Sequence, residues 1–283
     1  MRRIVLAALI ALFAFPAFPA FAADKGNRES AYDRVMRTGT IRCGYGIRTP
    51  LLVKDPNTGV FSGLFYDYVE NIAKALGLKV EWTEEIGWGD IIEALRNNRV
   101  DAFCSGLWPV SRRVVYLDFV KPVIYEPLYL FARNDYKHID PDLSVLNSPD
   151  VTFVGIEGST TYIVAERDFP RAKKISLPQL SPVTDGFMNV ITGKADVVIA
   201  DLATAAEFEK NNPGKLRSLR SERPVRAFGL SIAVDGNEDR LKRMLDLATE
   251  EFLQTGTMDT MLDGRAINKG SFLRVREPYE APK

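Results

Sequence analysis

The residues from 100 to 119, VDAFCSGLWPVSRRVVYLDF, join an apolar run to side chains that could bind a small charged molecule. The apolar part, Val100 to Cys104, is typical of a strand that is buried on both faces. It is followed by small residues, an indole and two guanidinium groups, contributed by Ser105, Gly106, Trp108, Arg112 and Arg113. Ligands of open α/β sheets bind just beyond the carboxyl ends of the strands. The stretch is therefore a candidate half-site for a small anionic or zwitterionic molecule, although taken alone it fits an ordinary loop with two solvated arginines better.

The first 22 residues have the three parts of a secretory signal peptide. Arg2 and Arg3 give a positive start, residues 4–15 form an apolar core, and Ala20-Phe21-Ala22 is a small-residue cleavage site. We expect cleavage before Ala23 and export of the mature chain. The alternative is an uncleaved anchor. No later stretch is apolar and long enough to suggest a membrane span.

The composition excludes several classes of function. The chain has 37 basic and 37 acidic residues, so without Arg2 and Arg3 its net charge is near −2. That balance is not typical of a protein that binds nucleic acid or an anionic membrane. The remaining chain, about 260 residues, is long enough for one large domain or two of ordinary size.

The hydrophobic pattern predicts two blocks in which strands and helices alternate. In the first block the expected strands are 40–45, 78–82 and 100–104, and the expected helices are 30–37, 67–76 and 90–97. In the second block the expected strands are 151–156, 172–176 and 195–200, and the expected helices are 162–168 and 183–192. An apolar strand at 125–133, a polar crossing at 134–150, a return strand at 228–234 and a helix at 238–253 connect them. This order predicts two α/β units, the second inserted into the first, with a cleft between their strand ends.

Seven segments, in this order and spacing, give the chain a family resemblance. They are TIRCGYG, GVFSGLFYDYVENIAKALG, WGDIIEALRNNRVDA, RRVVYLDFVKP, VGIEGSTT, GKADVVIAD and FGLSIAV. From about Gly39 to Leu262 the chain resembles family 3 of the extracellular solute-binding proteins, which serve amino-acid ABC transporters. The resemblance implies a two-lobed, type II periplasmic-binding-protein fold, with residues 23–130 and 227–283 in lobe 1 and 131–226 in lobe 2. It also implies a periplasmic monomer without cofactor, metal or catalytic residues, whose partners are a small-molecule ligand and an inner-membrane permease.

The resemblance assigns roles to four polar residues. Arg113 matches the arginine that forks onto the α-carboxylate of the ligand, which suits a planar guanidinium. Ser159 and Thr160 match the carboxylate contacts of the second lobe and would open a helix whose N–H groups favour an anion. Asp201 matches the aspartate that receives the α-ammonium. The plainer alternatives are a surface arginine and ordinary helix N-caps, and Asp201 could be both a cap and a ligand contact.

The chain also departs from the family pattern. Trp108 and Val110 stand where the family usually has hydroxyl residues after Gly106, and Arg48 replaces an aromatic residue ahead of Pro50. We expect Tyr45, Trp88 and Trp108 to be able to face the cleft as flat apolar walls, the alternative for each being core packing. With Asp201 they could also accept a cationic or methylated ammonium group. The ligand need not, therefore, be one of the common α-amino acids.

The chain holds two cysteines and one histidine. Cys43 and Cys104 lie on strands expected to be neighbours, and we favour two buried thiols over a disulfide because direct bridging across parallel strands is geometrically awkward. With His138 in a polar linker, these residues are too few for an ordinary zinc site. No Ser-His-Asp set or G-x-S-x-G motif is present.

We therefore expect a protein that captures a zwitterionic solute by hinge closure at 125–133 and 226–234. The alternative is an exported dehydratase of the cyclohexadienyl dehydratase type, for which Glu157 and Asp201 are the candidate acids. A receptor sensor lobe is a third, weaker possibility, because no membrane segment or signalling domain is seen after Leu262.

Overall fold

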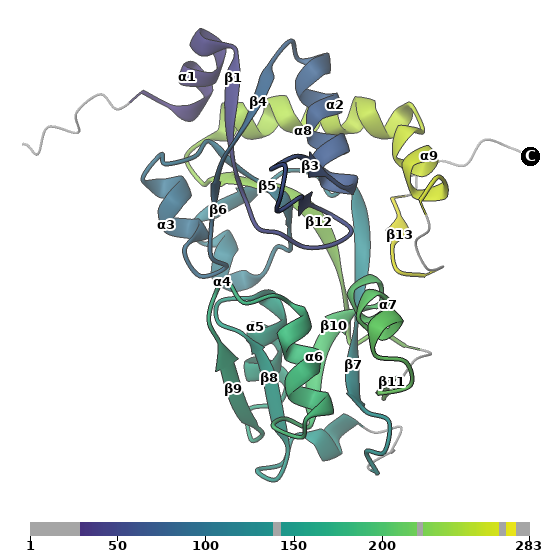
Figure 1. Ribbon diagram of the computed structural model, residues 1–283. Helices are drawn as coiled ribbons and strands as arrows, with labels where there is room; N and C mark the ends of the chain where they lie inside the picture. Colours follow the sequence, from purple (N-terminus) through teal and green to yellow (C-terminus); the bar gives the residue numbers. More distant parts are fainter. Residues whose placement is uncertain (1–28, 138–142, 220–222, 266–269, 276–283) are drawn as a thin grey trace, which may run out of the picture.

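A computed structural model describes residues 29–137, 143–219, 223–265 and 270–275 (Figure 1). The predicted signal peptide, its cleavage site and His138 lie outside the described residues. Within them, no helix is long and apolar enough to cross a membrane.

The first lobe is a twisted sheet flanked by helices (upper part of Figure 1). Its strands run in the order β4 (Lys79–Glu85), β1 (Thr40–Tyr45), β5 (Ala102–Leu107) and β12 (Arg226–Asp235), with β6 (Leu117–Phe119) also paired to β12. Its helices are α1 (Ala31–Thr38), α2 (Leu64–Ala75), α3 (Ile91–Arg96), α4 (Ser111–Val114), α8 (Asp239–Gln254) and α9 (Thr257–Asp263). A small separate sheet consists of β2 (Val53–Lys54) and β3 (Phe61–Ser62). The strands β4, β1 and β5 are parallel, as the alternating pattern predicts, so β1 and β5 end at the same edge of the sheet.

The second lobe repeats this arrangement (lower part of Figure 1). Its strands run in the order β7 (Ile124–Arg133), β10 (Val197–Asp201), β8 (Thr152–Ile156) and β9 (Lys173–Leu177), and β11 (Leu216–Ser218) also pairs with β7. The short strand β13 (Leu273–Arg274) pairs with the other end of β7, at Tyr125 and Ile124, next to the first lobe. Its helices are η1 (Leu143–Leu146), α5 (Thr160–Asp168), α6 (Thr184–Ile191) and α7 (Leu202–Asn211). Its core gathers apolar side chains from β7, β10 and the helices α6 and α7 around Phe187.

The chain passes between the lobes inside β7. Residues 124–128 of this strand pair with β12, and residues 128–132 pair with β10. The predicted crossing at 134–150 is therefore wrong. A single apolar strand can serve both lobes because each half of it finds a pairing partner. We propose the lobe boundaries 130/131 and 226/227 within this connection.

Local sequence signals explain where helix α1 begins and ends. Ser30 caps α1 by accepting a hydrogen bond from the Asp33 backbone N–H, and Gly39 ends the helix at a positive φ of 64°, a conformation that glycine adopts without strain. The strand predicted to break at Ser105 instead continues to Leu107, because β12 pairs with it as far as Leu107.

The two cysteines form a disulfide, so the expectation of two free thiols is wrong. Cys43 lies opposite Ala102 in the parallel ladder, which puts Cys104 diagonally across from it on the next strand. The resulting Cα–Cα distance of 5.5 Å falls within the ordinary range for a disulfide. The diagonal offset relieves the geometric problem of a bridge directly across parallel strands.

Candidate ligand site

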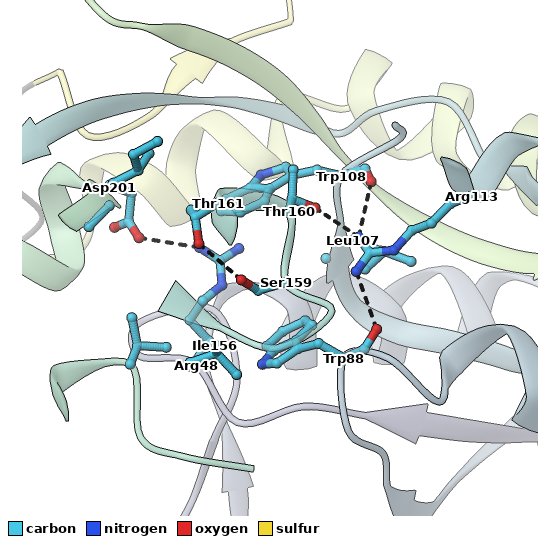
Figure 2. A pocket seen from close by; sticks show the side chains of 14 residues that line it. Arg48, Trp88, Leu107, Trp108, Arg113, Ile156, Ser159, Thr160, Thr161 and Asp201 are labelled. Carbon is cyan, nitrogen blue, oxygen red and sulfur yellow. Dashed lines mark hydrogen bonds and ion pairs between the residues drawn. The ribbon is translucent and has the colours of Figure 1, made fainter. Parts of the chain in front are cut away.

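A partly enclosed cavity lies between the lobes, at the ends of β5, β8 and β10 (Figure 2). The first lobe lines it with Arg48, Trp88, Gly106, Leu107, Trp108 and Arg113. The second lobe lines it with Ile156, Ser159, Thr160, Thr161, Val183, Ile199, Ala200 and Asp201. A cavity at the carboxyl ends of strands, walled mostly by apolar groups with a few convergent polar ones, is the usual form of a small-molecule site.

The structure brings together all of the predicted site residues except Tyr45. The Tyr45 ring is buried against Phe61 and Trp82, and its hydroxyl accepts a hydrogen bond from Lys54 Nζ at 3.2 Å. It packs in the core, the alternative that its sequence position also allowed, and we leave it out of the proposed site. Trp88 lines the cavity while packing edge-on against Phe103.

Gly106 shapes the site through its backbone. Its φ is +78°, and a Cβ at this position would lie 2.9 Å from the Phe65 ring. A larger residue would be strained and would collide with the core. The glycine thus turns the end of β5 so that Trp108 and Arg113 face the cavity.

Arg113 is a buried cation with only neutral partners among the described residues. Its Nη1 donates to Thr160 Oγ1 at 2.8 Å, and its Nη2 donates to the Gly158 carbonyl at 2.9 Å, both in the second lobe. Longer contacts of 3.4 Å join it to the carbonyls of Trp88 and Trp108 (Figure 2). Burial lowers the pKa of Arg113 to about 10, which leaves it charged at neutral pH. No carboxylate in the described part of the chain compensates this charge, so the position favours an anion.

The beginning of α5 supplies the facing wall. Ser159 is its N-cap, and its Oγ accepts a hydrogen bond from the Tyr162 backbone N–H at 3.2 Å. The Ser159 hydroxyl also lies 3.1 Å from that of Thr161. Ser159 therefore has the capping role that was the plainer alternative, and it lies on the cavity surface as well. A ligand contact by Ser159 or by Thr160 remains a prediction.

Asp201 is the N-cap of α7, which was the plainer alternative for it, and it also contacts Arg48. It caps α7, accepting hydrogen bonds from the backbone N–H and the hydroxyl of Thr204, each at 2.7 Å. Arg48 approaches the same carboxylate, with Nη1 3.4 Å from Oδ2 (Figure 2). The predicted ammonium site is thus already next to a cation that belongs to the protein.

Arg48 is held by a buried ionic cluster that it forms with Glu126 and Asp201. Its Nη1 lies 2.9 Å and 2.7 Å from the two carboxyl oxygens of Glu126. Its guanidinium lies over the Trp108 ring at 4.6 Å from the centroid, a favourable cation–π geometry. Trp108 therefore faces the cavity, as predicted, but it stacks on a residue of the protein itself.

Glu126 is fully buried, and burial raises its pKa to about 8. Asp201 adds to this rise, whereas Arg48 and the Trp108 indole oppose it. The cluster thus holds one carboxyl that is mainly protonated at neutral pH.

Sequence reasoning missed Glu126 and the role of Arg48. The signal for Glu126 was a single acid within the apolar strand IYEPLYLFAR. An isolated acid at the centre of such a strand is rarely buried unless a cation accompanies it. The replacement of an aromatic residue by Arg48 indicated that cation, but the sequence does not reveal which acid it pairs with.

The rim of the cavity is closed by contacts between the lobes. The Gly89 backbone N–H donates to Gln179 Oε1 at 2.8 Å. Gly158 approaches Gly89 so closely that a Cβ at Gly158 would lie 2.6 Å from the Gly89 backbone. The lobes meet at this point because neither residue has a side chain.

These features define a two-lobed periplasmic-binding fold with a partly enclosed polar site between its lobes. A model of the family described as bacterial extracellular solute-binding proteins, family 3, matches residues 41–264. That match covers most of the chain, which therefore belongs to this family.

Relatives with described roles support the same assignment. A probable histidine-binding protein of Campylobacter jejuni is 25% identical over 203 residues, which cover 71% of this chain and 75% of the relative. A probable amino-acid ABC transporter-binding protein of Haemophilus influenzae is 24% identical over 234 residues, with coverages of 80% and 84%. Among solved structures, an ancestral amino acid-binding protein, a precursor of cyclohexadienyl dehydratase, aligns with a TM-score of 0.71 and 26% identity, covering 83% of this chain and 99% of that one.

Proposed function

We propose that this protein captures a small solute with a carboxylate, an amino acid or a related compound, and delivers it to the permease of an ABC transporter. It would act in the periplasm, as a monomer, after removal of the predicted signal peptide. Family membership supports the class of function, and the relatives that are described as amino-acid-binding proteins support the class of ligand.

The observation that carries this proposal is the surroundings of Arg113. Arg113 is 3% exposed and carries a full charge, but the described residues offer its guanidinium only a hydroxyl and carbonyl oxygens. Removing a cation from water without an ionic partner is costly. A ligand carboxylate that accepts two parallel N–H bonds would offset that cost.

The arrangement also couples binding to closure. Arg113 belongs to the first lobe, whereas its closest partners, Thr160 and Gly158, belong to the second. A ligand held from both sides binds the closed form better than the open one and shifts the population towards it. The paired strands β7 and β12 connect the lobes and are the proposed hinge.

A thermal-shift screen of the mature protein tests the proposal. The panel contains amino acids, betaines, polyamines and small carboxylic acids. We expect carboxylate-bearing compounds to raise the melting temperature, because a ligand at about 100 times its dissociation constant adds about 2.7 kcal/mol to stability. Stabilisation by polyamines alone, or by no member of the panel, would contradict the proposal.

The dehydratase alternative has one supporting observation, the solved relative that is described as a precursor of cyclohexadienyl dehydratase. Of the two acids considered for it, Asp201 lines the cavity and Glu157 does not. Both oxygens of Asp201 already accept hydrogen bonds from Thr204. Incubation with prephenate or arogenate, with detection of the aromatic product, separates the two functions. Turnover would favour the enzyme.

A further inference from the structure

Two guanidinium groups of the first lobe, those of Arg48 and Arg113, line the same cavity (Figure 2). Arg113 has only neutral partners in the described chain. Arg48 is fixed from behind, since its hydrogen bonds to Glu126 and Asp201 all involve Nη1. Two cations therefore lie at different positions on the wall of the cavity.

Arg48 retains donors that the described residues do not use. No described side chain or carbonyl accepts a hydrogen bond from its Nε or Nη2. Neither nitrogen is among the fully buried polar atoms that lack a partner. Both nitrogens are therefore not fully buried, and Arg48 lines the cavity. A planar guanidinium offers such donors in a geometry that matches a carboxylate.

The acidic groups of the site do not cancel both cations. Asp201 is the only carboxylate on the described cavity wall, and it already accepts two hydrogen bonds from Thr204 besides its contact with Arg48. Glu126 lies behind Arg48 and does not line the cavity. The cavity wall itself then carries two guanidinium groups and one carboxylate, which favours a ligand with a net negative charge.

The cavity is also small. It holds about 50 Å³ beside Arg48, and about 10–15 Å³ of such space is needed for one water-sized group. A cationic side chain would be repelled by the two guanidinium groups on the cavity wall, whereas a compact anion would be attracted by both.

We propose that the ligand is a small dicarboxylate, with one carboxylate on Arg113 and the other on Arg48. This deepens the proposed function and rests on it, because it assumes that the protein captures a carboxylate-bearing solute. The class includes acidic amino acids and diacids without an amino group. Arg48 is then the residue that determines specificity.

Titration calorimetry on the mature protein at neutral pH tests this inference. The probes are succinate and glutarate, L-aspartate and L-glutamate, and L-arginine and L-histidine as cationic competitors. We expect binding of at least one diacid and much weaker binding of both cationic amino acids. Arg48→Gln should weaken diacid binding roughly ten- to hundredfold, the value of a lost hydrogen bond to a charged group. Arg48→Lys, which keeps the charge but not the fork, should lose less.

Arg240→Gln is the matched control. Arg240 also stacks on an aromatic ring, that of Tyr32, and pairs with the carboxylate of Asp33, but it is exposed and does not line the cavity. It should leave diacid affinity unchanged. Circular dichroism and melting curves of each variant show whether it is folded.

The possible results separate the dicarboxylate proposal from the broader proposed function. Binding of aspartate or glutamate alone identifies acidic amino acids as the source, and binding of succinate or glutarate identifies amine-free diacids, so either supports the dicarboxylate. Binding of arginine or histidine without any diacid, or unchanged diacid affinity in folded Arg48→Gln, overturns it and leaves the proposed function standing. If no compound of this panel binds, the dicarboxylate is overturned, and the broader thermal-shift screen decides separately whether the proposed function stands.

Discussion

Arg48 and Arg113 are buried in the same site, but only Arg48 has acidic partners among the described residues. Arg48 pairs with Glu126 and Asp201 and stacks on Trp108. Arg113 has a hydroxyl and carbonyl groups. Because a buried charge is stable only when it is compensated, Arg48 is held in place by the protein and can offer its remaining donors to the ligand. Arg113 depends on the ligand for an ionic partner.

The raised pKa of Glu126 predicts a specific dependence of stability on pH. Its ordinary value is 4.5, and burial raises it to about 8 in the folded protein. Between these values the folded chain holds a proton that the unfolded chain has released, so the contribution of Glu126 to stability falls as pH rises and is lost above about 8. Glu126→Gln stays neutral at every pH. We expect the free energy of unfolding of the wild type to decline more steeply than that of the variant between pH 5 and pH 9.

Denaturant titrations at several pH values measure this difference. Subtracting the variant from the wild type removes the groups that titrate in both proteins. Parallel curves for the two proteins would show that Glu126 is ionised in the folded state.

Residues of the site could be predicted from the sequence where the family pattern or the end of a strand pointed to them. Trp108 and Asp201 lie on the cavity wall as expected. Tyr45 does not, because an aromatic residue at a strand end fits the core as well as a cleft. Glu126 could not be found, since its partner is 78 positions away in the chain and only the folded strands bring them together.

At the scale of elements, the site is made by the end of β5 and the beginning of α5. Gly158 precedes α5 and contributes the carbonyl that accepts a hydrogen bond from Arg113. It also contacts Gly89 of the other lobe. The same turn therefore positions a polar group and permits the lobes to meet.

Gly158→Ala should keep the lobes apart. The new Cβ would lie 2.6 Å from the Gly89 backbone, a distance that requires the backbones to separate. We expect a larger radius of gyration in small-angle X-ray scattering, and weaker affinity for the most stabilising compound of the thermal screen.

Gly214→Ala is the control for backbone strain. Gly214 is in the second lobe, has a φ of +66°, close to the +73° of Gly158, and has open space around its Cβ position. It should cost stability through its backbone conformation without changing the radius of gyration or the affinity. Equal behaviour of the two variants would mean that Gly158 does not limit closure.

The order of strands and helices was predictable because their periodicities are strong, and β1 matches the predicted residues 40–45. The two errors have a common cause. The crossing inside β7 and the Cys43–Cys104 disulfide both depend on the pairing partners of a strand. Partners and their register are properties of the sheet, which a local sequence pattern does not specify.

For the whole molecule, the two lobes form a site between them, and among the described strands β7 and β12 connect both lobes (Figure 1). A solute enters a partly enclosed cavity when the lobes separate, and contacts from both sides then favour the closed form. The family and the fold support capture as the function. The charges of the site, rather than the fold, select what is captured.

The most direct test of this account is the dissociation constant of Arg113→Ala, measured by calorimetry with the most stabilising carboxylate of the thermal screen. Arg112→Ala is the control, because the Arg112 side chain is 69% exposed and its ion pair with Glu166 is long, at 3.8 Å. We predict an affinity loss of roughly a hundredfold for Arg113→Ala, as two charge-assisted hydrogen bonds are removed, and no change for Arg112→Ala. A folded Arg113→Ala protein with wild-type affinity would contradict the central claim that this guanidinium holds the carboxylate of the ligand.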